Sequence, residues 1–266
     1  MEARLPKSLR PARSSGLIRL GDVLDGGYVV SKDALLASDF LLSFGISTNW
    51  EFEKAFVQQR KLLGRDLEIH AYDHTVDAAS LRIHRLKQLA RYGLSLDPKH
   101  LASWKMAGGF RTFFDGRRAK HFKQKVWWED GDGCVGVRTI MDRVPSGRRI
   151  FVKMDIEGSE YRVAGDLARF ADRIVGMVVE FHDLDILRSN FELLHRQLTG
   201  HYDVAHIHAN SVGGLGPDAF PNILEITYEQ KGLGVSPAAV SNEEYPLAGL
   251  DKPNALDRPE YRVVFV

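Results

Sequence analysis

Cysteine is nearly absent from this chain, which holds one such residue, Cys134, among 266. A single cysteine excludes an internal disulfide framework and a cysteine-based zinc site, and it is typical of a reducing compartment. No apolar run reaches the ~20 residues of a membrane-spanning helix. The basic stretch before residue 20 lacks the apolar core of a signal peptide and is either a poorly ordered terminus or a contact for an anionic surface. We expect a cytoplasmic protein without a membrane span.

An excess of either charge is also missing, because 36 Lys and Arg residues balance 35 Asp and Glu residues. Any recognition of an anionic partner must therefore depend on a local cluster of basic residues. One segment interleaves basic with aromatic residues: Arg117, Arg118, Lys120, His121, Lys123 and Lys125 with Phe113, Phe114, Phe122, Trp127 and Trp128. It is either an anion- or nucleic-acid-binding surface or a solvated loop whose rings fill the core. The balanced total charge favours an anionic acceptor, such as an acidic glycan, over nucleic acid.

Two phosphate-binding signatures are missing as well, since the chain contains neither a Gly-x-Gly-x-x-Gly motif nor a Walker A motif. Their absence disfavours a nicotinamide or flavin cofactor and a P-loop kinase or ATPase. The chain does contain apolar runs that alternate with helical patterns. This alternation is typical of an α/β protein with a parallel sheet.

The expected elements can be placed along the chain. We expect main strands at 39–44, 67–72, 149–154, 174–181, 202–208 and 223–229, an edge strand at 261–266, and helices near 52–63, 79–93, 163–170 and 187–198. Asp183 or Asp185 is a suitable N-cap for the last helix. Residues 94–140 are expected to form irregular strands and an insertion. We expect an N-terminal extension and lid-like segment at 1–36, followed by one domain at 37–266 with an irregular insertion near 100–140.

Polar side chains gather where three of these strands end: Lys153, Asp155 and Glu157; Glu180 and His182; His206, His208 and Asn210. A strand that is covered on both faces should be apolar, and an unpaired buried carboxylate is costly. Asp155 could instead cap the following helix. His206 and His208 could instead be partly exposed residues of an edge strand. Because ligands bind beyond the carboxyl ends of parallel strands, their joint occurrence predicts the rim of an active site.

The loop Phe44–Asn49 lies between the first expected strand and helix, where a tight turn can approach a nucleotide-like ligand. Asp73 ends the second strand and is suited to bond ribose hydroxyls, or else it forms a turn with Thr75. The glycine pair in Asp25–Tyr28 predicts a tight turn, which is either purely structural or closes over the pocket.

The stretch IFVKMDIEGSEYRV at 150–163, followed by VVEFHDLD at 178–185, resembles the FkbM-type methyltransferase domain. Further segments resemble a bacterial branch of that family in the same order: DGGYVV at 25–30, LLSFGISTNWEFE at 41–53, AYDHT at 71–75, HIHAN at 206–210, PNILEITY at 221–228 and YPLAGLDKPN at 245–254. The resemblance covers most of the chain. Two departures are Thr48–Trp50, where another glycine is common, and His74, where this branch usually has proline.

The resemblance implies a Rossmann-like, seven-stranded class I methyltransferase sheet with helices on both faces. It also implies S-adenosyl-L-methionine as cofactor and O-methylation of a hydroxyl on a sugar, glycan or secondary metabolite. The expected cofactor contacts are Phe44, Gly45, Ser47, Asp73, Thr75 and Asp155. The expected substrate contacts are Tyr28, Glu157, His206 and Asn210.

Methyl transfer from a sulfonium needs a positioned acceptor and a group that takes its proton. We expect Asp155 to lie near both reactants and either His182 or His208 to be the general base, since a neutral imidazole accepts a proton near physiological pH. A divalent cation is an open alternative, because Asp155, Glu157, His182, His206 and His208 all offer suitable ligand atoms.

Overall fold

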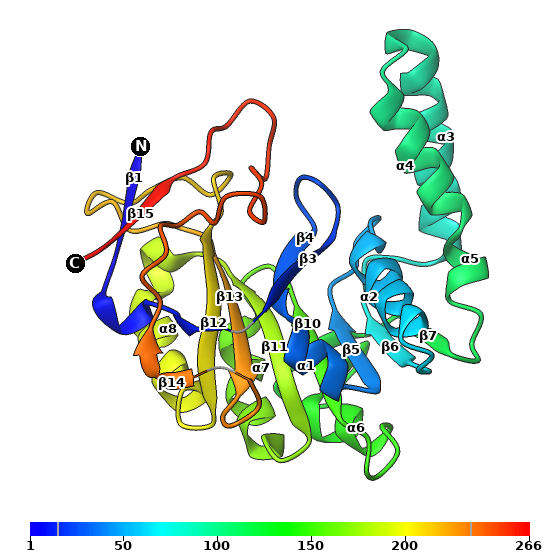
Figure 1. The fold of residues 1–266 in the computed structure, drawn as a ribbon. Helices are drawn as coiled ribbons and strands as arrows, with labels where there is room; N and C mark the ends of the chain where they lie inside the picture. The colour runs from blue at the N-terminus through cyan, green and yellow to red at the C-terminus, as the bar shows by residue number, and fades with distance from the viewer. Residues whose placement is uncertain (15, 235) are drawn as a thin grey trace.

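The computed structural model describes residues 1–14, 16–234 and 236–266, and its centre is a seven-stranded sheet with the strand order β12-β13-β11-β10-β5-β6-β7 (Figure 1). The strands are β5 (Phe40–Phe44), β6 (Glu68–Tyr72), β7 (Ala119–Phe122), β10 (Ile150–Met154), β11 (Ile174–Phe181), β12 (Tyr202–Ala209) and β13 (Leu224–Gln230). Strands β7, β6, β5, β10 and β11 pair in parallel, whereas β13 is antiparallel to both neighbours. This is the Rossmann-like arrangement expected from the sequence.

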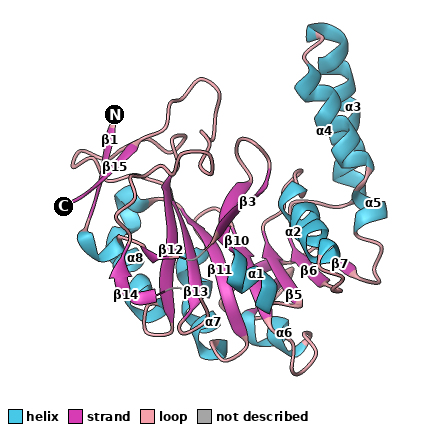
Figure 2. Ribbon diagram, viewed as in Figure 1, coloured by secondary structure: helices cyan, strands magenta, loops and turns pink. Residues whose placement is uncertain are grey.

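Helices cover both faces of the sheet (Figure 2). The helices that pack here are α1 (Lys32–Ala37), α2 (Glu51–Leu62), α6 (Val137–Asp142), α7 (Glu160–Leu167) and α8 (Leu184–Leu198). Successive residues of a strand face opposite sides. Accordingly Leu41 joins the core that contains α1 and α2, while Leu42 joins the core that contains α6, α7 and α8. Both cores need apolar strand residues, which explains why β5, β10 and β11 are buried throughout.

Residues 94–140 match the expectation of irregular strands only in part, because the segment before β7 is helical. The chain forms α3 (Ala78–Ser95), α4 (Pro98–Gly108) and α5 (Phe110–Phe113) before β7, then β8 (Lys125–Trp127) and β9 (Cys134–Gly136). Asp77 and Ser80 form a capping box at the start of α3, and Asp97 caps α4, which has Pro98 in its first turn. The helix expected at 79–93 is α3, whereas α4 was not expected, although Asp97 and Pro98 are the sequence signal for its start.

The N-terminal segment is folded rather than loose. Strand β1 (Glu2–Leu5) pairs in parallel with β15 (Arg262–Phe265), and Ala3 and Leu5 are fully buried. The last strand therefore joins a two-stranded sheet of its own and not the edge of the central sheet. The remaining short elements are η1 (Lys7–Leu9), β2 (Ala12–Arg13), β3 (Leu17–Gly21), β4 (Gly27–Ser31), η2 (Ala168–Phe170) and β14 (Ser236–Val240). Within the described residues, no helix combines the length and apolarity required to cross a membrane.

Candidate functional site

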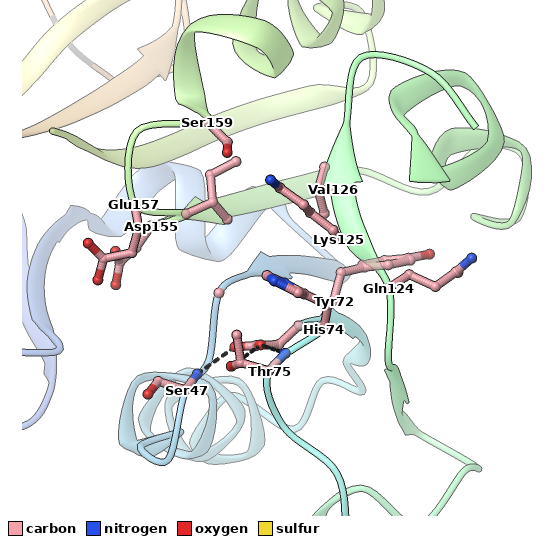
Figure 3. A pocket seen from close by; sticks show the side chains of 13 residues that line it. Ser47, Tyr72, His74, Thr75, Gln124, Lys125, Val126, Asp155, Glu157 and Ser159 are labelled. Atoms are coloured by element: carbon pink, nitrogen blue, oxygen red, sulfur yellow. Dashed lines mark hydrogen bonds between the residues drawn. The ribbon is translucent and has the colours of Figure 1, made fainter. Parts of the chain in front are cut away.

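A cavity of about 270 Å³ opens at the carboxyl ends of β5, β6 and β10 (Figure 3). It is lined by Gly45, Ser47, Tyr72, Asp73, His74, Thr75, Gln124, Lys125, Val126, Asp155, Ile156, Glu157 and Ser159. The chain order of the strands reverses between β5 and β10, so the cavity lies at the topological switch point of the sheet. This is where open α/β sheets bind their ligands.

The turn after β5 has room for glycine alone. Gly45 has a φ of +76°, and a Cβ there would lie 1.7 Å from the backbone oxygen of Asp155. Lys153 donates to the Gly45 carbonyl oxygen and lies 3.3 Å from Asp155 Oδ2. Burial alone would lower the pKa of Lys153, but the carboxylates of Asp155, Glu53 and Glu180 raise it. A buried cation thus ties the first loop to the end of β10.

Asp73 connects the same loop to the end of β6. Its Oδ2 accepts hydrogen bonds from Ile46 N at 3.0 Å and Ser47 N at 2.7 Å. Its Oδ1 accepts from the amide and hydroxyl of Thr75 at 2.7 and 2.6 Å. Burial favours the neutral acid, yet these four hydrogen bonds outweigh it and lower the pKa of Asp73. A carboxylate offers about four acceptor sites, so a ribose hydroxyl must replace one of these donors in order to bind Asp73.

His182, just after β11, faces a group of carboxylates. Its Nδ1 lies 3.2 Å from Oε1 of the fully buried Glu160, while Nε2 lies 3.8 Å from Asp155 Oδ1 and 3.6 Å from Glu157 Oε2. Burial opposes a charge on His182, but the hydrogen bond and charge of Glu160 prevail and raise its pKa to about 9. Glu160 also accepts from the amides of Ile156 and Gly158. The final Glu of the Asp-x-Glu-Gly-x-Glu sequence therefore holds both the loop and the imidazole.

Three of the five residues considered as metal ligands come together. One ligand atom from each of Asp155, Glu157 and His182 lies within 4.8 Å of the other two, close enough for a single divalent cation. His206 and His208 lie elsewhere and have carboxylate partners of their own.

Tyr28 and Asn210 extend the polar group below the cavity. The Tyr28 hydroxyl lies 2.8 Å from Glu180 Oε2 and 3.0 Å from Asp155 Oδ2. The Asn210 amide donates to Glu180 Oε1 at 2.9 Å. Burial, together with the charges of Asp155 and Glu225, raises the pKa of Glu180 well above its usual range. A neutral Glu180 can donate a proton within this group, which limits the repulsion between neighbouring carboxyls.

The histidines of β12 belong to a closed network. His208 places Nδ1 3.1 Å from Glu225 Oε2 and Nε2 2.9 Å from Glu260 Oε2, and His206 Nε2 lies 3.1 Å from Asp251 Oδ2. Burial would lower the pKa of His208, but Glu225 and Glu260 raise it well above its usual value. With both ring nitrogens bonded to carboxylates, His208 is a cation with no free site for a proton.

Three of the five non-glycine residues with positive φ among the described residues lie in loops at this edge of the sheet. Ser47 follows β5, Glu157 follows β10 and Asp183 follows β11, with φ values of 45°, 53° and 55°. Such conformations are costly for residues with a Cβ and recur where a site imposes them. Asp183 occupies the N-cap position of α8, as expected, but its side chain makes no capping hydrogen bond.

Of the expected cofactor contacts, five line the cavity: Gly45, Ser47, Asp73, Thr75 and Asp155. Phe44 is instead fully buried in the core against Tyr72. Gln124 and Ser159 also line the cavity but were not expected there, because each lies in a loop and loop residues carry no periodic signal. Glu225 was missed as well, although a carboxylate inside the apolar strand ILEITY was a detectable signal.

The basic and aromatic segment is largely neutralised. Lys120 pairs with Glu68, Arg118 pairs with Asp66, and Lys123 pairs with Asp77. Most of its rings pack internally, as when Phe122 stacks on Tyr72 with ring centres 4.7 Å apart, whereas Trp128 is 56% exposed. Lys125 alone of its basic side chains lines the cavity. These contacts agree with the interpretation of a basic loop whose rings fill the core.

No family model and no curated protein matches this sequence. Among solved structures, the chain is similar to a precorrin-6y C5,15-methyltransferase from Geobacter metallireducens, with 14% identity and a TM-score of 0.35 over 74% of this chain and 86% of that chain. It is also similar to a dimethyladenosine transferase from Plasmodium falciparum, with 12% identity and a TM-score of 0.33 over 75% of this chain and 59% of that chain. Because these TM-scores are low, the assignment of the fold rests on the strand order.

Proposed function

We propose that this protein is an S-adenosyl-L-methionine-dependent methyltransferase of the FkbM-like kind. The observation that carries the proposal is the cavity at the switch point between β5 and β10, which is lined by the carboxylates of Asp73, Asp155 and Glu157 from the loops after β6 and β10. A cavity of about 270 Å³ without a phosphate-binding glycine motif suits a ligand that contains a ribose but no pyrophosphate.

The cavity residues fit this cofactor chemically. Tyr72, Val126 and Ile156 supply an apolar wall for a base, and Asp155 and Glu157 supply negative charge for a sulfonium. When bound, S-adenosyl-L-methionine supplies a methyl group on a positively charged sulfur. Asp73 would accept a ribose hydroxyl in place of one of its four present donors.

We assign the acceptor to the side of the cavity at Asp155 and Glu157, which His182 and Tyr28 adjoin from outside the lining. Glu160 holds the imidazole by Nδ1, which leaves Nε2 directed towards the reacting hydroxyl. His182 takes the acceptor proton once it is neutral. We infer O-methylation of a sugar, glycan or secondary metabolite in the cytoplasm, with His208 as a structural residue.

Binding of the cofactor is the first test. The melting temperature should rise with S-adenosyl-L-methionine and S-adenosylhomocysteine but not with NAD; a ligand at 100 times its Kd adds about 2.7 kcal/mol to the free energy of unfolding. Asp155→Asn should weaken binding, while Asp166→Asn, a carboxylate paired with Arg169 outside the cavity, should not. An unchanged melting temperature with both adenosyl compounds would contradict the proposal.

The acceptor is the second test. Hydroxylated sugars and acidic glycans are screened for formation of S-adenosylhomocysteine, and NMR of the product locates the new methyl group on oxygen, nitrogen or carbon. A divalent cation at Asp155, Glu157 and His182 is the alternative use of these side chains. Loss of turnover with a chelator and its return with Mn²⁺ would favour that alternative, and indifference to the chelator would remove it.

A further inference from the structure

The helices α3 and α4 form a hairpin that projects from the body of the protein between β6 and β7 (Figure 1). Contacts between the helices give it a defined shape. Arg85 stacks on the Trp104 ring at 4.6 Å, His84 Nε2 lies 2.8 Å from Ser103 Oγ, and His100 Nδ1 lies 2.7 Å from Gln88 Oε1. The hairpin is thus held together by specific contacts between α3 and α4, and its outer face does not pack on the core.

The hairpin concentrates positive charge. Residues 78–111 contain seven Lys and Arg residues and a single acidic residue, Asp97, whereas the whole chain has a net charge of only +1. Asp97 is itself paired with Lys99. The rest of the chain is therefore net acidic, and positive charge is concentrated on one projecting element.

The same element exposes large aliphatic side chains. The exposed fractions are 56% for Ile83, 69% for Leu86, 48% for Leu89, 89% for Leu94 and 70% for Leu96. At about 3.6 residues per turn, Ile83, Leu86 and Leu94 lie on the face of α3 opposite the buried Leu81. The exposed basic residues Arg82, Lys87 and Arg91 flank that apolar stripe.

We propose that the α3–α4 hairpin docks on the surface of a lipid bilayer with anionic headgroups. An apolar stripe flanked by basic residues is suited to the boundary between headgroups and acyl chains, where the aliphatic side chains insert and the cations meet the headgroups. A second copy of the chain would bring two strongly positive hairpins together, which is unfavourable. Single-stranded nucleic acid would need exposed aromatic rings for stacking, whereas the stripe is made of Ile and Leu.

Docking has a consequence for the cavity, because α3 begins three residues after Thr75, which lines it. A bilayer under the hairpin would hold the carboxyl edge of the sheet near the membrane surface. This inference concerns binding alone and does not depend on the proposed methyl transfer.

Co-sedimentation of the full chain with vesicles tests the proposal. We expect binding to vesicles of phosphatidylcholine with phosphatidylglycerol, little binding to pure phosphatidylcholine, and release by salt. Replacing three cations in Arg82→Gln, Lys87→Gln, Arg91→Gln should weaken binding on the order of 100-fold, at about a factor of five per charge. Leu86→Ser with Leu94→Ser should weaken it on the order of 10-fold or more.

Matched controls outside the hairpin keep the test specific. Leu256→Ser removes an equally exposed leucine, and Arg117→Gln removes a basic residue beyond α5; both should bind vesicles as the wild type does. Equal binding to neutral and anionic vesicles would overturn the proposal, as would the absence of binding. Salt-dependent binding of an oligonucleotide without vesicle binding, or a dimer that Leu86→Ser dissociates, would overturn it in favour of another partner.

Discussion

Two polar regions lie next to each other at the carboxyl edge of the central sheet, and they differ in how their side chains are paired. In the first region, around His182, Nδ1 is bonded to Glu160 while carboxylate oxygens stand 3.6–3.8 Å from Nε2. In the second region, around His208, both nitrogens have carboxylate partners at 2.9–3.1 Å. Among the described residues, Nε2 of His182 therefore has no carboxylate within hydrogen-bonding distance, whereas both ring nitrogens of His208 have one.

The difference separates a reactive site from a structural one. An imidazole with both ring nitrogens hydrogen-bonded is fixed by its neighbours, whereas one with a free ring nitrogen can still bind a ligand. His208, Glu225 and Asn254 fix the ends of β12 and β13 to the C-terminal segment. His182 owes its orientation to Glu160 on α7 and remains open on the other side.

The largest effect is expected from removing the imidazole of His182, which has a free ring nitrogen. His182→Ala should lower turnover on the order of 10²- to 10⁴-fold, because the acceptor proton loses its base. Binding of S-adenosyl-L-methionine, measured by calorimetry, should change little. His182→Gln, which keeps a polar group near Glu160 but accepts no proton at neutral pH, should be equally slow.

Wild-type turnover in both variants would contradict the role of His182 as base. Loss of cofactor binding in both would instead assign His182 to the binding of the cofactor.

Removing the imidazole of His208, which has carboxylate partners at both ring nitrogens, should lower the stability of the fold. His208→Ala leaves Glu225 and Glu260 without their cation in a buried position, and breaking such a pair costs about 3–5 kcal/mol of unfolding free energy. Urea unfolding measures this loss. Below the transition, turnover per folded molecule should stay within about 10-fold of the wild type, less than the loss expected of a missing base. A stable His208→Ala protein without turnover would reverse the assignments of the two histidines.

Much of the fold could be predicted because strand periodicity is a local property. The runs DFLLSF and IVGMVVEF are buried on both faces and became β5 and β11. The first helix of the hairpin was expected at 79–93 and is α3, but α4 could not be recognised in the same way, since its side towards α3 carries the polar residues His100 and Ser103. Its hydrophobic pattern therefore does not match a helix packed on a core.

Only those site residues that lie at the ends of strands could be predicted from the sequence. Asp73 and Asp155 end strands and line the cavity, as expected. His182 and His208 are indistinguishable in sequence, because each lies two residues after a polar residue near a strand end. The partners that separate them, Glu160 and Glu260, come from α7 and a C-terminal loop, and contacts of such long range leave no local pattern.

A pH titration should move stability and activity in opposite directions. The pKa of His182 is raised from 6.5 to about 9, so its contribution to stability is complete below pH 6.5 and is lost as the pH rises through about 9. The loss is on the order of 3 kcal/mol. Over the same range kcat/KM should increase, because only neutral His182 accepts a proton. His182→Gln should flatten both profiles, and a kcat/KM that falls between pH 7 and 9 would exclude His182 as the base.

The smallest effect is expected at Glu157, whose φ of 53° is strained for a residue with a Cβ. Glu157→Gly relieves about 1–2 kcal/mol of strain but adds about 0.5–1 kcal/mol of chain entropy, so stability should rise by about 0.5–1 kcal/mol. Turnover should fall, because a carboxylate at the rim of the open region is lost. Thermal unfolding with a turnover assay measures both. A gain in stability without loss of activity would mean that the region around His182 depends on the turn at residue 157 and not on the Glu157 side chain.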